Sequence, residues 1–289
     1  MLFRPDTEAE TRTIDTVDNS IVTINHNQHR LKGKCHEHTH HVQPPVSHIG
    51  HDSHGERQSM ISPAELVRSY SGRYATALGI ELAAADSGER FKWFIAAILF
   101  GTRISELLAT RTWREFAAHG LLDPQHMVDT GWDGLVAILD AGGYVRYDFK
   151  TATKLLAVCS ALLHDYAGDL DRLHALANDS RDLETRLKAL GKGIGDTTVA
   201  IFLRELRGIW SKAAPPLSPL ALAAAQQLGY IRHGRHATGQ ALARLQQKWT
   251  SDGQAADDFA DFEAALVRVG PRLRREESRY HRSPDKEAA

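Results

Sequence analysis

The sequence predicts an all-α fold, and three observations support this prediction. From residue 66 onward, apolar residues recur at helical spacing along most of the chain. No stretch alternates apolar and polar residues as a half-buried strand would. The interruptions are short and contain Gly142-Gly143, Pro215-Pro216 or Gly253, which are typical of turns between helices. With 289 residues, 42% of them hydrophobic, the chain can bury a substantial core.

The expected helices follow one another in chain order. Their apolar stripes span residues 66–82, 91–100, 104–116, 135–139, 149–163, 170–176, 183–190, 199–206, 220–228, 241–249 and 259–269. Before the first stripe stands S-P-A-E at 62–65, which gives a cap, a proline and a glutamate in capping-box order. We therefore expect translation to start at Met60, one helical domain over residues 60–280, and a polar tail over 281–289.

Residues 187–203 place a glycine-rich turn between two of these helices, with the sequence L-K-A-L-G-K-G-I-G-D-T-T-V-A-I-F-L. Gly193 and Gly195 can adopt backbone angles that are closed to other residues, and they let main-chain N–H groups approach a ligand. Asp196 or Thr197 would cap the helix that follows. Free N–H groups at a helix start bind phosphate, so the turn predicts a phosphate contact.

This turn resembles the hairpin of the helix-hairpin-helix (HhH-GPD) DNA glycosylase superfamily, the endonuclease III-like proteins of base excision repair, whose motif reads L-x-x-L-x-G-I/V-G-x-x-T-A. Three further segments resemble the family in the same order, at 91–105, 138–156 and 216–229. The resemblance implies two helical subdomains, with the helix-hairpin-helix motif flanking a DNA-binding cleft. The expected partner is double-stranded DNA, and we expect the chain to be a monomer.

The resemblance also implies which residues contact DNA. They lie in the hairpin and in the turn after residues 91–100, where Thr102 and Arg103 stand near the position of the family's intercalating glutamine. The implied DNA-binding residues are Thr102, Arg103, Gly191, Lys192, Gly193, Ile194, Gly195, Thr197 and Thr198. A monovalent cation at the hairpin carbonyl groups is implied as well.

The positions that carry the family's chemistry differ in this chain. Ser218, followed by Pro219, stands where the family has its catalytic aspartate, and a serine hydroxyl cannot carry that charge. Thr197 stands at the position of the family's Schiff-base lysine, so lyase activity is not expected. The catalytic residues are therefore unassigned.

Other carboxylates have simpler interpretations than catalysis. Asp196 and Asp148 are expected to cap helices, and Glu205 to face solvent or to form an internal ion pair. Two hypotheses stay open. The chain is either a divergent monofunctional DNA N-glycosylase, or a non-catalytic protein on the same scaffold that recognises lesions or binds proteins. An acidic side chain that faces the hairpin across a pocket would favour the enzyme, and a filled cleft would favour the binder.

Composition limits where DNA could bind. Lys and Arg number 35 against 36 Asp and Glu, so the net charge is -1 and any DNA affinity must come from a local face. The candidate basic residues are Arg103, Lys188, Lys192, Arg204, Arg268, Arg272, Arg274, Arg275 and Arg279. Trp93, Tyr144, Tyr147 and Trp210 are aromatic residues for a cleft, whereas Trp132 and Phe149 are expected to pack in the core.

Cys35 and Cys159 are the chain's two cysteines, so the four-thiolate iron–sulfur cluster of endonuclease III-like enzymes is excluded and no cofactor is expected. Cys159 is expected to be a buried thiol. Residues 1–59 contain nine of the sixteen histidines, and C-H-E-H-T-H-H at 35–41 could bind zinc or nickel. A disordered tail, or a segment outside the translated protein, is the alternative interpretation, and no metal site is assigned. Without a membrane-length apolar run or a signal peptide, we expect a cytoplasmic protein.

Overall fold

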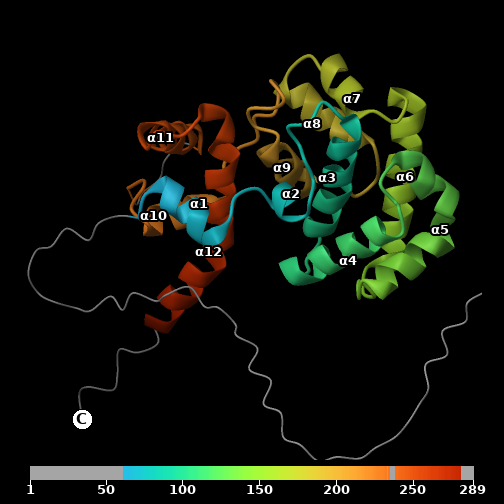
Figure 1. Ribbon diagram of the computed structural model, residues 1–289, viewed down its shortest axis with the longest axis horizontal. Helices are drawn as coiled ribbons and strands as arrows, with labels where there is room; N and C mark the ends of the chain where they lie inside the picture. The colour runs from blue at the N-terminus through green and yellow to red at the C-terminus, as the bar shows by residue number, and fades with distance from the viewer. Residues whose placement is uncertain (1–60, 233, 235–237, 281–289) are drawn as a thin grey trace, which may run out of the picture. The chain divides into compact units, whose positions relative to one another are not determined.

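Figure 1 shows the computed structural model, which describes residues 61–232, 234 and 238–280. All of these residues belong to the second of two units of the chain, 51–289. The expected tails over 1–59 and 281–289, the start at Met60 and the 35–41 segment lie outside the described residues.

The described residues form helices and no strand, which confirms the predicted all-α class. The helices are α1 Pro63–Tyr70, α2 Tyr74–Ala77, α3 Ser87–Phe100, α4 Glu106–Ala118, α5 Pro124–Ala141, α6 Asp148–Tyr166, α7 Leu170–Leu176, α8 Ser180–Ala189, α9 Asp196–Glu205, α10 Pro219–Gln227, α11 Thr238–Ser251 and α12 Phe259–Tyr280. A 3₁₀ turn, η1 Ala256–Asp258, leads into α12.

Side-chain caps define where many of these helices begin. At α1, Ser62 and Glu65 form the predicted capping box, in which the Ser62 N–H donates to the Glu65 carboxylate at 3.0 Å. The other side-chain caps are Asp86, Ser105, Asp123, Asp169, Asp179 and Ser218. Each such cap contributes about 1 kcal/mol, so the helix starts are largely set by neighbouring residues in the sequence.

The helix predicted over residues 66–82 is divided in the structure. Helix α1 ends at Tyr70, and α2 begins only at Tyr74. At the break, the Arg73 N–H donates to Asp261 Oδ1 on α12 at 2.8 Å instead of continuing the helix. A Cβ at Gly72 would lie 2.0 Å from the same Asp261 oxygen. The break is therefore a product of tertiary contact, which the apolar spacing did not indicate.

Helix α5 is longer than the stripe predicted over 135–139. Its N-cap is Asp123, whose carboxylate accepts from the N–H groups of Gln125 and His126, and Pro124 is the first residue of the helix. Gly131 interrupts the helical backbone with a φ of 69°. The Asp123-Pro124 pair is a recognisable helix start in the sequence. Because apolar residues are sparse in the first half of α5, the apolar spacing alone did not predict this part of the helix.

Two hydrophobic clusters form the core of the described residues. The larger is built around α3, which packs against α4, α7 and α9 and which has Phe94 edge-on to Phe202 at 4.8 Å between ring centroids. The smaller is built mainly from α1, α10, α11 and α12, with Trp249 stacked on Phe262 at 5.7 Å. Val267 on α12 packs against both clusters. Figure 1 shows α12 beside α1 and α10, as their contacts also require.

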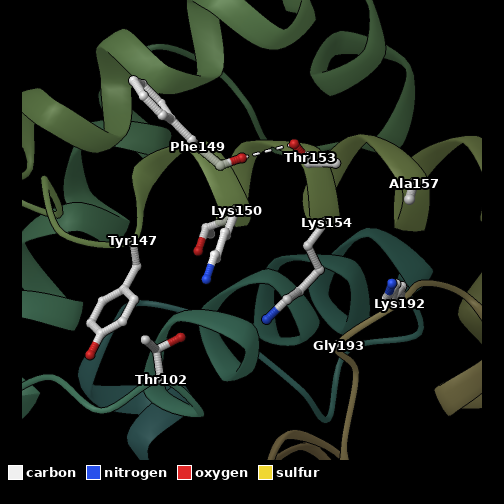
Figure 2. Close-up of a pocket in the computed structure, with 10 residues that line it drawn as sticks. Thr102, Tyr147, Phe149, Lys150, Thr153, Lys154, Ala157, Lys192 and Gly193 are labelled. Carbon is white, nitrogen blue, oxygen red and sulfur yellow. Dashed lines mark hydrogen bonds between the residues drawn. The ribbon is translucent and has the colours of Figure 1, made fainter.

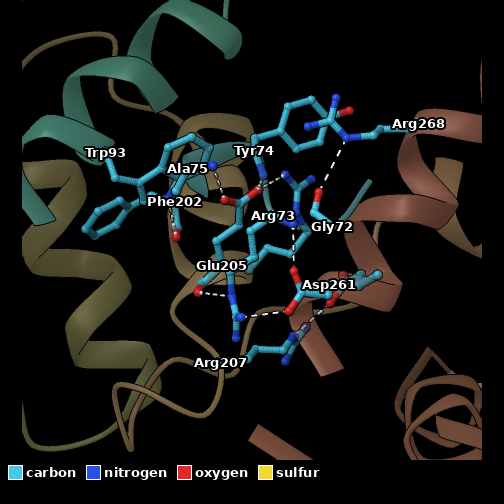
Figure 3. Close-up of polar contacts among 12 residues, drawn as sticks. Gly72, Arg73, Tyr74, Ala75, Trp93, Phe202, Glu205, Arg207, Asp261 and Arg268 are labelled. Atoms are coloured by element: carbon cyan, nitrogen blue, oxygen red, sulfur yellow. Dashed lines mark hydrogen bonds and ion pairs between the residues drawn. The ribbon is translucent and has the colours of Figure 1, made fainter. Parts of the chain in front are cut away.

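A buried polar network connects α2, α9 and α12 (Figure 3). The fully buried Glu205 carboxylate accepts from the N–H groups of Tyr74 at 2.9 Å and Ala75 at 2.8 Å, and pairs with Arg204 at 3.0 Å. Helix α2 has no side-chain cap of its own, so Glu205 on α9 serves as its cap. Of the two interpretations of Glu205, the internal ion pair is confirmed and the solvent-facing one is wrong.

None of the described helices is long and apolar enough to cross a membrane.

Cys159 is buried in the larger cluster, as predicted, and burial raises the pKa of its thiol to about 12. Because the thiolate is the reactive form, the native thiol should not react at pH 8. In a Cys35→Ser variant, a chromogenic disulfide reagent should therefore label Cys159 only after urea unfolding. Rapid labelling of the folded variant would contradict the buried placement.

Candidate functional site

A tight turn over residues 190–195 joins α8 to α9. Gly193 has a φ of 94°, a conformation that favours glycine, and a Cβ at Gly191 would lie 2.9 Å from Val158 Cγ2 on α6. These two glycines therefore let the turn fold back closely onto α6. The predicted special backbone angles are confirmed for Gly193 but wrong for Gly195, which has an extended backbone with a φ of -109°.

The start of α9 differs from the prediction. Gly195 is its N-cap and no side chain caps it, so the expected capping by Asp196 or Thr197 is wrong. Asp196 instead pairs with Lys188 on α8, with Oδ1 and Nζ 2.5 Å apart. Among the described residues, no hydrogen-bond acceptor is recorded for the N–H groups of the first turn, Asp196, Thr197 and Thr198. The N–H groups of the exposed Asp196 and Thr197 remain available to a ligand.

The turn between α3 and α4 lies directly against α9. A Cβ at Gly101 would be only 2.5 Å from Thr198 Oγ1, so the two backbones approach closely. Thr102 and Arg103 follow at once, and the Arg103 side chain is exposed. The structure thus brings together the two segments for which the sequence implied DNA contacts.

Not all of the implied DNA-binding side chains are accessible. Lys192 and Thr197 are exposed, whereas Ile194 and Thr198 are buried, so the side chains of the latter two cannot contact a ligand. The carbonyl groups of Lys192 and Gly193 accept no hydrogen bond from another described residue. Two free carbonyl oxygens fit a cation, and the monovalent cation at the hairpin stays a prediction.

A cavity of about 600 Å³ lies between this turn and α6, and we name it the lysine cavity. Its walls include Thr102, Tyr147, Lys150, Lys154, Lys192 and Gly193. In Figure 2 the side chains of Lys150 and Lys154 point from α6 toward Thr102, while the Phe149 ring points away from them. Among the described residues, no carboxylate lines this cavity, and burial lowers the pKa of Lys154. The cavity is a cationic site.

A second cavity, of about 260 Å³, contains Thr197 and Ser218, the two positions to which the resemblance assigned the family's catalytic residues. We name it the Ser218 cavity; Thr197, Arg204, Ser218 and Glu263 are among its lining residues. The Ser218 hydroxyl accepts from the Ala221 N–H at 3.1 Å and caps α10. Helix capping therefore explains why serine precedes proline at positions 218 and 219.

Glu263 on α12 is the acidic residue of the Ser218 cavity that the sequence did not single out. It is 1% exposed and pairs with Arg207, whose Nε lies 2.8 Å from its carboxylate. Burial raises the pKa of Glu263, and the neighbouring Arg207 opposes this shift. An acidic residue therefore lines the same cavity as the start of α9.

A third cavity, of about 240 Å³, adjoins the second and shares Arg204 with it. We name it the arginine cavity, after Arg204 and Arg268; Tyr74, Trp93, Phe100 and Glu106 also line it. Arg268 lies over the Tyr74 ring at 3.7 Å and pairs with Glu106 at 2.6 Å. Arg204 Nε and Arg268 Nη2 are buried without a hydrogen-bond partner in the described structure. A buried donor without an acceptor is costly, which favours a ligand with acceptor groups.

Three other sequence expectations have clear outcomes. Asp148 is the first residue of α6 rather than its cap, which is Tyr147. Trp132 and Phe149 are 38% and 57% exposed and contact each other at 5.2 Å between centroids, so their prediction as core residues is wrong. Of the aromatic residues proposed for a cleft, Trp93 lines the arginine cavity and Tyr147 the lysine cavity, whereas Tyr144 and Trp210 line neither.

Sequence reasoning missed Lys154 and Glu263. Lys150 and Lys154 are one helical turn apart, a spacing that places both on one face and that could have been recognised. Glu263 gave no such signal, because it reaches its cavity from α12, 45 or more positions along the chain from Ser218 and Thr197.

No family model and no curated protein matches this chain.

Proposed function

We propose that the chain binds double-stranded DNA through the turn between α8 and α9, as a divergent relative of the helix-hairpin-helix DNA glycosylases of base excision repair. The observation that carries the proposal is the close contact between Gly101 and Thr198. It sets Arg103 and the glycine-rich turn side by side, although some 90 residues separate them in the sequence.

The chemistry of the turn supports phosphate as the ligand. The first N–H groups of α9 are uncapped, and the positive end of the helix dipole favours an anion there. Arg103 and Lys192 are exposed beside these groups. The Lys188 ammonium offsets the negative charge of Asp196 within 2.5 Å. A local cationic face therefore exists on a chain whose net charge is -1.

Replacing Arg103 and Lys192 together by glutamine should weaken duplex binding for every sequence alike. Each lost phosphate contact should reduce the magnitude of the slope of log affinity against log salt by about 0.9. The slope of the double variant should therefore be smaller in magnitude by about 1.8. Fluorescence anisotropy of a labelled duplex at several salt concentrations measures this. Gly193→Val is a poorer test, because a φ of 94° strains any side chain at that position.

Lys248→Gln on α11 is the matched control, since Lys248 lines none of the three cavities and lies outside both segments. Its duplex affinity should equal that of the wild type. An Arg103→Gln/Lys192→Gln variant that is folded and keeps the wild-type affinity and salt slope would refute the proposed surface.

Base excision is a second candidate, and the placement of Glu263 favours it. Excision needs an acid to protonate the leaving base or a carboxylate to stabilise charge on the sugar. A carboxyl group with a raised pKa is suited to the acid role. Glu263 lines the cavity that contains Ser218 and Thr197, and the adjoining arginine cavity carries aromatic walls and free N–H donors.

The test incubates the full chain with duplexes that carry uracil, 8-oxoguanine, alkylated purines, oxidised pyrimidines or an abasic site, followed by hot alkali. Because residue 197 is threonine rather than the lysine that lyase activity needs, an active protein should give strand breaks only after alkali treatment. Glu263→Gln should abolish these breaks. Ser218→Asp keeps a capping side chain and adds a carboxylate, so it should raise excision. If neither the wild type nor Ser218→Asp gave strand breaks and both still bound duplex DNA, the result would favour the non-catalytic hypothesis.

A further inference from the structure

The charged side chains that line the lysine cavity are all cationic, and most of the remaining wall is carbon surface. Thr102 Oγ1 already donates to the Ile98 carbonyl at 3.3 Å. Thr153 Oγ1 donates to the Phe149 carbonyl at 2.8 Å and accepts from Trp132 Nε1 at 3.0 Å. The Tyr147 and Thr151 hydroxyls also line the cavity, and its three ammonium groups supply the positive charge.

The three lysines have no competing partner within the described structure. No hydrogen bond or ion pair to another described residue is recorded for Lys150, Lys154 or Lys192, and no carboxylate lines the cavity. Most other lysines of the described region are engaged: Lys92, Lys188 and Lys212 each bind a carboxylate or carbonyl group. The lysine cavity therefore concentrates positive charge that the protein itself does not neutralise.

Glycine at the turn lets this arrangement form. A Cβ at Gly193 would lie 3.0 Å from Lys154 Cε and 3.7 Å from its Nζ, so the lysine chain lies across the turn. Lys150 and Lys154 are on one face of α6, and Tyr147 precedes that helix at the same edge of the cavity. The ammonium groups and the aromatic ring are thus held by one helix and one glycine turn.

The size and chemistry of the cavity fit a small ligand with an anionic end and a ring. Its volume of about 600 Å³ lies within the range of about 300–1,000 Å³ of small-molecule sites. A phosphate accepts hydrogen bonds from several ammonium groups, and a base stacks on an aromatic ring such as that of Tyr147. We propose that the lysine cavity binds a nucleoside monophosphate, free or as the terminal nucleotide of a DNA strand, with its phosphate on Lys150 and Lys154 and its base on Tyr147.

This site adjoins the duplex surface proposed above and shares Lys192 and Gly193 with it, but the nucleotide contacts with Lys150, Lys154 and Tyr147 do not depend on duplex binding. Isothermal titration calorimetry of the full chain with deoxyadenosine 5′-monophosphate should give saturable binding. Deoxyadenosine and inorganic phosphate should each bind at least about tenfold more weakly, because each lacks one half of the recognised groups. Lys154→Gln should weaken the nucleotide about tenfold, and the exposed Lys150→Gln should also weaken it without risk to folding.

The pH dependence separates ligand contact from a structural role of Lys154. Burial lowers the pKa of Lys154 in the unliganded chain, and a bound phosphate would raise it again. The affinity for deoxyadenosine 5′-monophosphate should therefore fall as the pH rises through the range in which Lys154 loses its proton. Lys154→Gln should remove this dependence, while Lys248→Gln should retain both the affinity and its pH profile.

A competition experiment distinguishes the two sources of the nucleotide. If the ligand is a strand end, a duplex with a 5′-phosphorylated single-nucleotide overhang should displace the nucleotide better than the same duplex with a 5′-hydroxyl. If the ligand is the free nucleotide, the two duplexes should compete equally, whether or not the 5′-phosphate is present. No saturable nucleotide binding, equal affinity for inorganic phosphate, or unchanged affinity in both lysine variants would overturn the inference. Nucleotide binding without duplex binding would refute only the proposed function.

Discussion

Glu205→Ala is expected to destabilise the fold by about 3–5 kcal/mol, the range found when one partner of a buried ion pair is removed. The Glu205 carboxylate is 0% exposed and accepts from two backbone N–H groups as well as from Arg204. Its loss leaves those donors without an acceptor, and each unsatisfied buried donor costs about 1–3 kcal/mol. Urea denaturation followed by circular dichroism measures the change.

Two comparisons make this result specific to the buried network. Glu205→Gln keeps one acceptor oxygen and should lose less stability than Glu205→Ala. Glu276→Ala removes an exposed carboxylate that pairs with Arg272 on the surface, and it should cost less than about 1 kcal/mol. If Glu205→Ala and Glu276→Ala had equal effects, Glu205 would not be the interhelical cap described above.

Arg207→Ala is the second large expected effect, because it leaves the Glu263 carboxylate buried without its partner. The guanidinium also donates to the Pro215 carbonyl group and so holds the segment between α9 and α10. The expected loss at neutral pH is about 3–5 kcal/mol. Replacing both partners by apolar residues, Arg207→Met with Glu263→Leu, should recover much of this loss.

The effect of Arg207→Ala should depend on pH. Burial raises the pKa of Glu263 and Arg207 opposes that shift, so removing Arg207 moves the folded-state pKa of the carboxyl group further upward. A carboxyl whose folded-state pKa exceeds the unfolded value binds its proton more tightly when folded. The resulting stabilisation is present below the unfolded pKa of about 4.3 and is lost as the pH rises through the folded pKa.

Relative to the wild type, Arg207→Ala should therefore be less destabilised at pH 5 than at pH 8. Thermal unfolding at the two pH values measures this difference. The double variant lacks the titrating group and should show no such change relative to the wild type. A pH-independent loss in Arg207→Ala would mean that Glu263 does not titrate in the folded chain.

The sequence predicted features that depend on neighbouring residues. The apolar spacing gave the helical class, S-P-A-E gave the capping box at Ser62, and the glycines at 191 and 193 gave a tight turn between helices. Each of these is decided within a few residues of the chain. The apolar stripe over 66–82 was misleading because its break is made by Asp261 on α12.

The candidate site could be predicted only in part. Thr102, Lys192 and Gly193 were singled out and do line one cavity, and Thr197 and Ser218 line another. Their neighbours Lys154 and Glu263 come from helices whose packing the linear sequence does not specify. The expected caps at Asp148 and Asp196 were wrong because each residue lies one position inside its helix.

The contact between Gly101 and Thr198 also has a mechanical consequence. Since no Cβ fits between these backbones, the turn carrying Arg103 and the start of α9 cannot slide past each other without breaking the contact. The distance between the two groups of donors is therefore set by the fold rather than adjusted to each ligand. On the proposed function, a duplex would have to bring its phosphates to this fixed spacing, so DNA that bends or narrows its groove easily would be bound in preference to stiff DNA.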